Sequence, residues 1–256
     1  MAGPIQQRLL PDTAAIDTDG QATVGGCRLT DLADQFGTPL FVYDEEHLRA
    51  RCREAVAAFG PGVSYASKAF LCGAMARLVV EEGMHIDVST GGELYMARHA
   101  GVPGEKLVMH GNNKSELELR MAIDEGVRRI VVDSFDELDR LEALHAETGV
   151  TPKILLRITP GVEAHTHEFI STGQDDSKFG FTVSTGLAAI AVERAVVSSA
   201  VELMGVHCHI GSQVFEVGSF ARTVEIMAQF SVPLGLPDLS IGGGLGVAYL
   251  EEDQAS

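Results

Sequence analysis

The sequence predicts an α/β fold, a (β/α)8 barrel of the TIM type that is incomplete, with about seven strands present. Short apolar runs alternate with amphipathic stretches along most of the chain, a pattern typical of parallel strands covered by helices. The first four apolar runs begin at residues 63, 85, 106 and 129, at the spacing of a repeated βα unit. A glycine-rich turn follows the last run rather than the first, which favours a closed barrel over an open doubly wound sheet.

The individual elements follow from these patterns in chain order. Residues 1–38 are rich in turn residues, Thr38–Asp44 is expected to form an early strand, and Glu45–Phe59 is expected to be a helix with one apolar face. Ser134 and Glu137 predict an N-cap and a capping box for a later helix. The predicted barrel strands cover residues 63–67, 85–89, 106–110, 129–133, 153–159, 203–210 and 238–244. The helices between them are predicted over residues 71–83, 91–101, 115–126, 134–149, 184–200 and 219–230.

Composition restricts the class of protein. The 256 residues carry a net charge of −17, which disfavours nucleic acid as a partner because like charges repel. The four cysteines form no C-x-x-C pair and are expected to be reduced thiols. The N-terminus has no apolar run of signal-peptide length, and no segment is apolar enough to cross a membrane. We therefore expect a soluble, cytoplasmic protein. Because the chain stops soon after the seventh predicted strand, we also expect that an eighth strand is missing.

Polar residues cluster where the predicted strands end, which is where a barrel carries its chemistry. The stretch "VSYASKAFLCG" places Lys68 directly after the first barrel strand, between small residues. A lone strand-end lysine is usually solvated, but further polar residues follow the other strands. They are Asp87, Ser89, His110, Asn112, Asn113, Asp133, Arg157, His207, His209 and Ser212. Taken together they predict an active site at this end of the barrel.

Two motifs leave alternatives open. "HCHIGSQ" could place His207 and His209 on one face of a strand as metal ligands, or could place one imidazole against a flat cofactor ring. "GGGLG" could be a flexible turn, or its amides could hold an anion. The polar stretch 165–181 interrupts the βα repeat, and we expect it to form a loop over the barrel mouth.

Six motifs together resemble the diaminopimelate decarboxylase family, which belongs to the alanine-racemase-like, fold-type III class of pyridoxal-phosphate enzymes. They are "YASKAF", "DVSTGGE", "HGNNKS", "HTHEFISTGQDDSKFGF", "HCHIGSQ" and "IGGGLG", and the resemblance runs from about Phe41 to Tyr249. It implies pyridoxal 5'-phosphate as the cofactor and no metal. It also implies the decarboxylation of meso-2,6-diaminopimelate to L-lysine and CO2, the last step of bacterial lysine biosynthesis, by a carboxy-lyase.

The same resemblance implies a role for each matching residue. Lys68 would form a Schiff base with the cofactor, and Asp87 and Glu93 would hold the lysine amine after substrate displaces it. The residues implied to bind the cofactor are Lys68, Arg157, His209, Ser212, Gly242, Gly243 and Gly244. His209 would stack on the ring, and the three glycines would surround the phosphate.

The resemblance also implies parts that this chain does not contain. Members of the family continue with a glutamate for the pyridine nitrogen and with a β-rich C-terminal domain that completes a homodimer. Residues 1–43 would pack with that domain, and residues 44–256 would form the partial cofactor-binding barrel. The chain alone is therefore expected to show little or no turnover. A related decarboxylase acting on ornithine or arginine, a non-catalytic cofactor-binding homologue and a zinc hydrolase using His207 and His209 remain alternatives.

Overall fold

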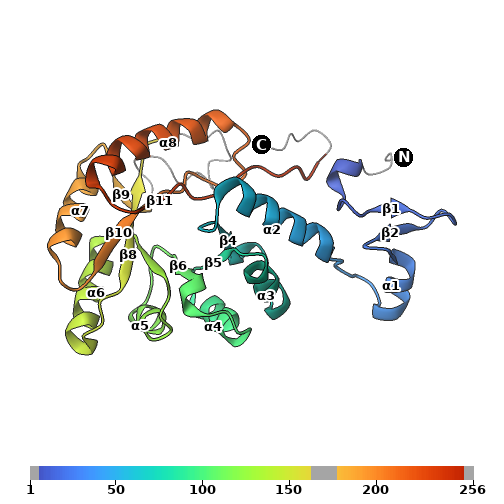
Figure 1. Cartoon of the computed structure of the whole chain (residues 1–256), viewed down its shortest axis with the longest axis horizontal. Helices are drawn as coiled ribbons and strands as arrows, with labels where there is room; N and C mark the ends of the chain where they lie inside the picture. The colour runs from blue at the N-terminus through green and yellow to red at the C-terminus, as the bar shows by residue number, and fades with distance from the viewer. Residues whose placement is uncertain (1–5, 163–177, 251–256) are drawn as a thin grey trace.

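A curled sheet of parallel strands forms the centre of the molecule (Figure 1). The computed structural model describes residues 6–162 and 178–250. The seven strands of the curl are β4 (Ser64–Ala66), β5 (His85–Val88), β6 (Leu107–Met109), β7 (Arg129–Val132), β8 (Lys153–Thr159), β10 (Glu202–His207) and β11 (Asp238–Ser240). Their order is β11-β10-β8-β7-β6-β5-β4, every pairing is parallel, and the short strand β9 (Phe181–Thr182) adds to β8. The predicted seven-strand partial barrel is confirmed.

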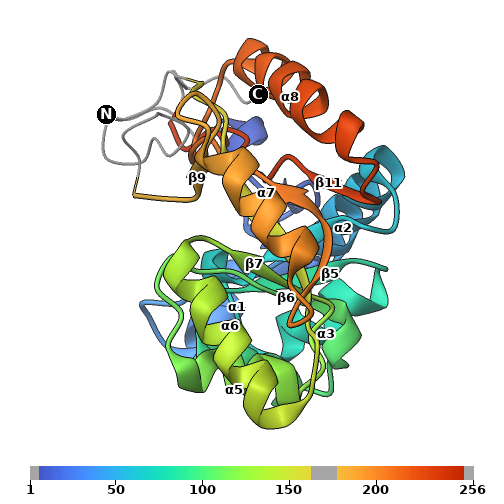
Figure 2. The ribbon, with the colours of Figure 1, turned by 90° about the vertical axis from the view of Figure 1, so that its left-hand side faces the viewer.

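Helices cover the convex side of this sheet (Figures 1 and 2). They are α3 (Gly73–Glu81), α4 (Gly91–His99), α5 (Glu116–Asp124), α6 (Phe135–Thr148), α7 (Leu187–Val197) and α8 (Val217–Ser231). The main apolar core lies between strands and helices, where Ile86, Leu107, Ile130 and Leu156 are fully or almost fully buried. A second, smaller cluster of Val108, Val131, Leu155 and Met204 fills the concave side. Neighbouring strand residues point to opposite faces, so one strand supplies both clusters.

The helix starts follow the capping signals only in part. Ser134 accepts a hydrogen bond from the Glu137 amide at 3.2 Å, as predicted. A capping box would also have the Glu137 carboxylate accept from the Ser134 amide. That part of the prediction is wrong, because the carboxylate accepts from the Asp133 amide instead. A complete capping box forms at α5, between Ser115 and Glu118.

The N-terminal segment forms a small unit beside the barrel (Figure 1). It contains a three-stranded sheet, β1 (Ala15–Ile16), β2 (Ala22–Val24) and β3 (Cys27–Arg28), followed by α1 (Leu29–Phe36). The early strand predicted over Thr38–Asp44 is wrong. Within the described ranges no strand lies beside these residues to pair with them, so their consecutive apolar side chains remain exposed, with Phe41 at 86%.

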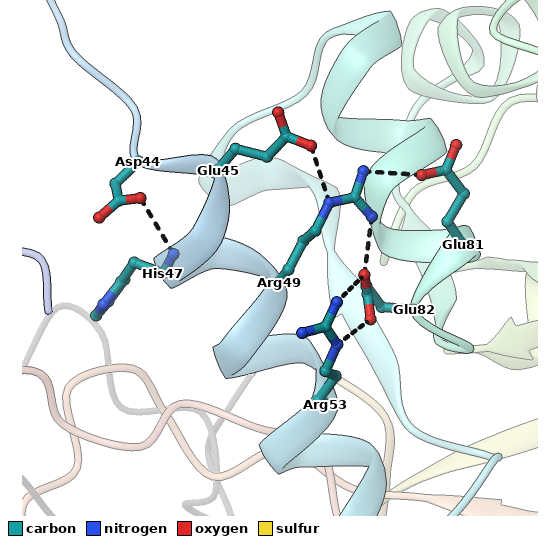
Figure 3. Close-up of polar contacts among 7 residues, drawn as sticks. All are labelled: Asp44, Glu45, His47, Arg49, Arg53, Glu81 and Glu82. Atoms are coloured by element: carbon teal, nitrogen blue, oxygen red, sulfur yellow. Dashed lines mark hydrogen bonds and ion pairs between the residues drawn. The ribbon is translucent and has the colours of Figure 1, made fainter. Parts of the chain in front are cut away.

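Helix α2 (Glu45–Phe59) is fastened to α3 by a cluster of charged side chains (Figure 3). Asp44 caps the helix by accepting from the His47 amide. The Arg49 guanidinium contacts Glu45, Glu81 and Glu82, with nitrogen–oxygen distances of 2.8–2.9 Å. Arg53 makes a two-pronged contact with Glu82. Because Glu82 lies just beyond the end of α3, this cluster fixes α2 against the edge of the barrel that β4 forms.

No helix in the described part of the chain is both long and apolar enough to span a bilayer.

Candidate active site

Lys68 lies at the carboxyl end of β4, within the single 3-10 turn η2 (Ser67–Ala69). Two features hold this turn in place: Ser67 is buried, and the Tyr65 hydroxyl of β4 donates to the Phe70 carbonyl at 2.8 Å. The Lys68 side chain is exposed. Asp87 is the half-buried residue of β5 that lies in register with Ala66 of β4. The predicted neighbours Lys68 and Asp87 therefore share one corner of the barrel mouth.

His209 faces this corner from the segment that follows β10. Its pKa falls to about 4, chiefly because the ring is buried and secondly because the positive charges of Arg157, Lys68 and His110 oppose protonation, while Asp87 favours it. Electrostatic effects of this size need close approach. His209 is therefore a neutral ring at pH 7, surrounded by the charged residues that the sequence singled out.

Arg157 is buried in β8 and is held by groups of the protein. Its Nη1 lies 3.4 Å from Asp133 Oδ1, and its guanidinium stacks on Phe179 with 4.2 Å from Cζ to the ring centroid. The other Asp133 oxygen accepts from the Gly180 amide at 3.0 Å. Burial raises the pKa of Asp133, and the Arg157 charge offsets part of that rise. Arg157 thus belongs to a buried ion pair that also anchors the chain just before β9.

Glu93 lies at the start of α4 (Gly91–His99) and hydrogen-bonds to the backbone before it. Its Oε2 accepts from the Ser89 amide at 2.6 Å and from the Thr90 hydroxyl at 3.4 Å. Thr90 in turn accepts from the Glu93 amide, so the pair caps the start of α4. In this conformation the carboxylate serves the helix terminus rather than the Lys68 amine.

The glycine-rich turn after β11 offers an anion site. Gly242 and Gly244 have φ values of +71° and +94°, which favour glycine. A Cβ on Gly244 would overlap the Gly211 carbonyl and would lie tightly against the His209 ring. Throughout the described residues, the amides of Gly242, Gly243 and Gly244 donate no hydrogen bond. Three consecutive free amides at a strand end fit a phosphate group.

Ser212 lies in the loop that packs against this turn. The Val214 amide donates to the Gly244 carbonyl at 2.9 Å, and the Gly246 amide donates back to Val214. The Gln213 side chain donates to the Val247 carbonyl and accepts from its amide, both at 3.0 Å. These contacts hold the Ser212 loop and the glycine turn together at the mouth.

The structure also joins two predicted strand-end histidines, His110 and His207, and adds Ser240, which the sequence did not indicate. His110 follows β6, and its Nε2 lies 3.3 Å from Asp87 Oδ1. Its ring meets the His207 ring edge-to-face, with centroids 5.0 Å apart, and His207 Nδ1 lies 2.8 Å from the Ser240 hydroxyl. The strand-end position of His110 was a usable signal, whereas the partner of His207 is 33 residues away in the sequence.

Within residues 6–162 and 178–250, no group of three acidic, histidine or cysteine side chains could hold a metal ion. Most of the predicted loop 165–181 lies outside the described residues.

The chain is similar to known proteins both in sequence and in fold. The family model for the pyridoxal-binding domain of pyridoxal-dependent decarboxylases matches residues 45–256. Diaminopimelate decarboxylase of Mycobacterium tuberculosis is 47% identical over 95% of this chain, and that of Bacillus subtilis is 45% identical over 96%. The structure of the M. jannaschii diaminopimelate decarboxylase in co-complex with L-lysine superposes with a TM-score of 0.88 at 36% identity, covering 96% of this chain and 59% of that one.

The matches cover nearly all of this chain but only part of its relatives. The chain spans 57% of the M. tuberculosis protein and 58% of the B. subtilis protein. The matched residues include every predicted site residue and the whole curled sheet. The chain therefore belongs to the pyridoxal-dependent decarboxylase family, carries its pyridoxal-binding domain, and is a homologue of the diaminopimelate decarboxylases.

Proposed function

We propose that this chain holds pyridoxal 5'-phosphate on Lys68 and that it serves the decarboxylation of meso-2,6-diaminopimelate to L-lysine. The observation that carries the proposal is the barrel mouth itself. There an exposed lysine, a neutral imidazole and three unbonded amides come from strands at opposite ends of the sheet. The names of the relatives support the choice of substrate.

The bound cofactor would supply an electron sink for the pair of electrons left when a carboxylate departs as CO2. The residues of the chain would position it. Lys68 would hold the cofactor through its amine, because a primary amine makes a bond that substrate amines can exchange. Asp87 would retain the lysine ammonium group while substrate occupies its place. The Gly242–Gly244 amides would bind the phosphate, with Ser212 beside them.

His209 and Arg157 would shape the site around the cofactor. A neutral imidazole can stack on a protonated aromatic ring without charge repulsion, and burial keeps His209 neutral. Arg157 would contribute positive charge from β8, where Asp133 and Phe179 hold its side chain. For Glu93 the resemblance remains the only support, since its carboxylate caps α4 in this structure.

Borohydride reduction followed by peptide mapping tests the cofactor assignment. We expect a reduced pyridoxyl group on Lys68 after incubation with pyridoxal 5'-phosphate, no label in Lys68→Ala, and full label in the control Lys153→Arg. Lys153 is exposed at the amino end of β8, away from the mouth. A label on another lysine, or none on a folded chain, would refute the assignment.

The substrate assignment needs a separate measurement. With the cofactor attached, we expect meso-diaminopimelate to perturb its absorbance at lower concentration than ornithine or arginine does. A preference for ornithine or arginine would leave Lys68 in its role and overturn the substrate. CO2 release by this chain alone is expected to be small, because the family resemblance places further site residues in a longer protein. Turnover comparable to that of the longer relatives would contradict this expectation.

A further inference from the structure

A row of four polar side chains crosses the concave side of the sheet. It runs from Asp87 of β5 to His110 after β6, then to His207 of β10 and Ser240 of β11. The successive contacts are 3.3 Å between Asp87 Oδ1 and His110 Nε2, 5.0 Å between the two imidazole centroids, and 2.8 Å between His207 Nδ1 and Ser240 Oγ. Because β7 and β8 separate β6 from β10 in the sheet, the two histidines meet through the curl rather than through strand pairing.

The His207 end of this row is uncharged near neutral pH. The pKa of His207 is lowered well below its ordinary value, first by burial and then by electrostatic interaction with His110, Arg157 and His209. His207 is therefore neutral, and its contact with Ser240 is a neutral hydrogen bond. The remaining acid–histidine contact of the row is the one between Asp87 and His110.

The surroundings of His110 explain why that pair matters to the site. Asp87 faces it from β5 and His207 faces it from β10, while His209 and Arg157 are close enough to His207 to influence its charge. Lys68 acts on His209 from the end of β4. Of these groups, Asp87 alone is an acid, so it is the partner of a protonated His110.

We propose that His110 is a positioning residue for Asp87, holding its carboxylate at the barrel mouth and exchanging one proton with it. The proton moves between His110 Nε2 and Asp87 Oδ1, and no other bond changes. The charge that Asp87 presents to the Lys68 amine thus depends on His110, with His207 and Ser240 keeping the imidazole in place from behind. This inference rests on the proposed role of Lys68 as the cofactor lysine.

The test compares the rate at which pyridoxal 5'-phosphate attaches to Lys68 across the pH range in which histidine titrates. Attachment is followed by absorbance and by the mass of the borohydride-trapped adduct. Three variants separate the possible roles: His110→Gln keeps a donor near the Nε2 position but cannot take a proton, His110→Leu removes both properties, and His99→Gln is the exposed control.

We expect the wild-type rate to show an ionisation between about pH 5 and 8 that is absent in His110→Gln. At neutral pH we expect His110→Leu to attach the cofactor about 10-fold more slowly, because it loses the polar contact with the Asp87 carboxylate. His99→Gln should match the wild type in both respects. A His110→Gln profile that coincides with the wild-type profile would overturn the proposal.

A cofactor-free measurement keeps the inference separate from the proposed function. The ring protons of His110 are followed by NMR during a pH titration of the wild type and of Asp87→Asn. Loss of the carboxylate should move the His110 titration to lower pH, since the negative charge favours imidazolium. An unchanged titration would refute the pair even if Lys68 binds the cofactor. A shifted titration in a chain whose Lys68 takes no label would support the pair and refute the proposed function.

Discussion

Gly244 shows how a single residue determines whether two loops of the site can approach each other. Its φ of +94° lies in the region that favours glycine, and an added Cβ would overlap the Gly211 carbonyl. At the neighbouring Gly243 an added Cβ would meet no other atom, and the φ angle does not lie in the region that favours glycine. The two glycines are adjacent in sequence but have different structural requirements, which makes them a matched pair for mutation.

Gly244→Ala is therefore expected to lower the free energy of unfolding by about 2 kcal/mol and to weaken pyridoxal 5'-phosphate binding by about 10-fold or more. Gly243→Ala is expected to change the free energy of unfolding by less than about 0.5 kcal/mol. Denaturant unfolding and absorbance titration with the cofactor measure both quantities. Equal losses of stability in the two variants would show that the contact with Gly211 is not what requires glycine.

At the scale of elements, Lys114 joins three segments behind the strand ends. It is fully buried, and its Nζ donates to the Gly111 carbonyl at 2.6 Å and to the Val131 carbonyl at 2.7 Å. The same nitrogen lies 2.8 Å from Glu137 Oε1 as an ion pair. Glu137 Oε2 accepts from the Asp133 amide, so the end of β7 and the start of α6 share one buried charge pair. The loop before α5 is fixed to both.

Lys114→Met is expected to lower the free energy of unfolding by about 3–5 kcal/mol, because it leaves Glu137 as a buried, uncompensated acid. The double variant Lys114→Met/Glu137→Gln should recover part of that loss. Arg120→Met, which removes a surface pair with Glu147, should cost less than about 1 kcal/mol. Urea unfolding of the four proteins checks this ordering, and a double variant no more stable than Lys114→Met would contradict it.

At the scale of the whole molecule, buried histidines link stability to pH. The pKa of His209 is lowered to about 4, and that of His207 is lowered well below 6.5. In the unfolded chain both rings bind protons as the pH falls below 6.5, while in the folded chain they do not. The free energy of unfolding must therefore fall on acidification, because protons bind preferentially to the unfolded state. Asp133 and Glu137, whose pKa values burial raises, act in the opposite direction.

Between about pH 7 and pH 5 each of these histidines should remove up to about 1.4 kcal/mol of stability per pH unit. In His207→Gln the free energy of unfolding should fall less steeply on acidification, because the contribution of one histidine is removed. In His99→Gln the slope should stay unchanged. Denaturant titrations at several pH values measure the slope. If the two variants had the same slope, His207 would not be the neutral buried ring that its position indicates.

The sequence predicted the barrel well because its signals are local and repeated. All seven strands and the helices between them lie where apolar runs and amphipathic stretches alternate, with Lys153–Thr159 and Glu45–Phe59 matching to the residue. The N-terminal sheet escaped prediction because its strands are two or three residues long. Thr38–Asp44 has a strand pattern, but pairing requires a neighbour that no local pattern reveals.

The site was predictable only to the level of strand ends. Parallel strands bring their carboxyl ends to one edge, so the proximity of Lys68, Asp87 and His209 follows from topology. The capping role of Glu93, the buried position of Lys114 and the contact between His207 and Ser240 depend on side-chain conformations and on contacts distant in sequence. The packing role proposed for residues 1–43 remains a prediction, and an open groove of about 760 Å³ lined by Leu32, Phe36 and Phe41 lies at that unit.

The aromatic contact at the junction of the two units has a mechanical consequence. Tyr43 stacks on Phe70 with ring centroids 4.3 Å apart and an interplanar angle of 13°. Phe70 lies two residues after Lys68, and its carbonyl is tied to Tyr65 of β4. The segment that leads from the N-terminal unit therefore contacts the residue that ends the lysine turn. A displacement of Tyr43 would therefore act on Phe70, two residues from Lys68.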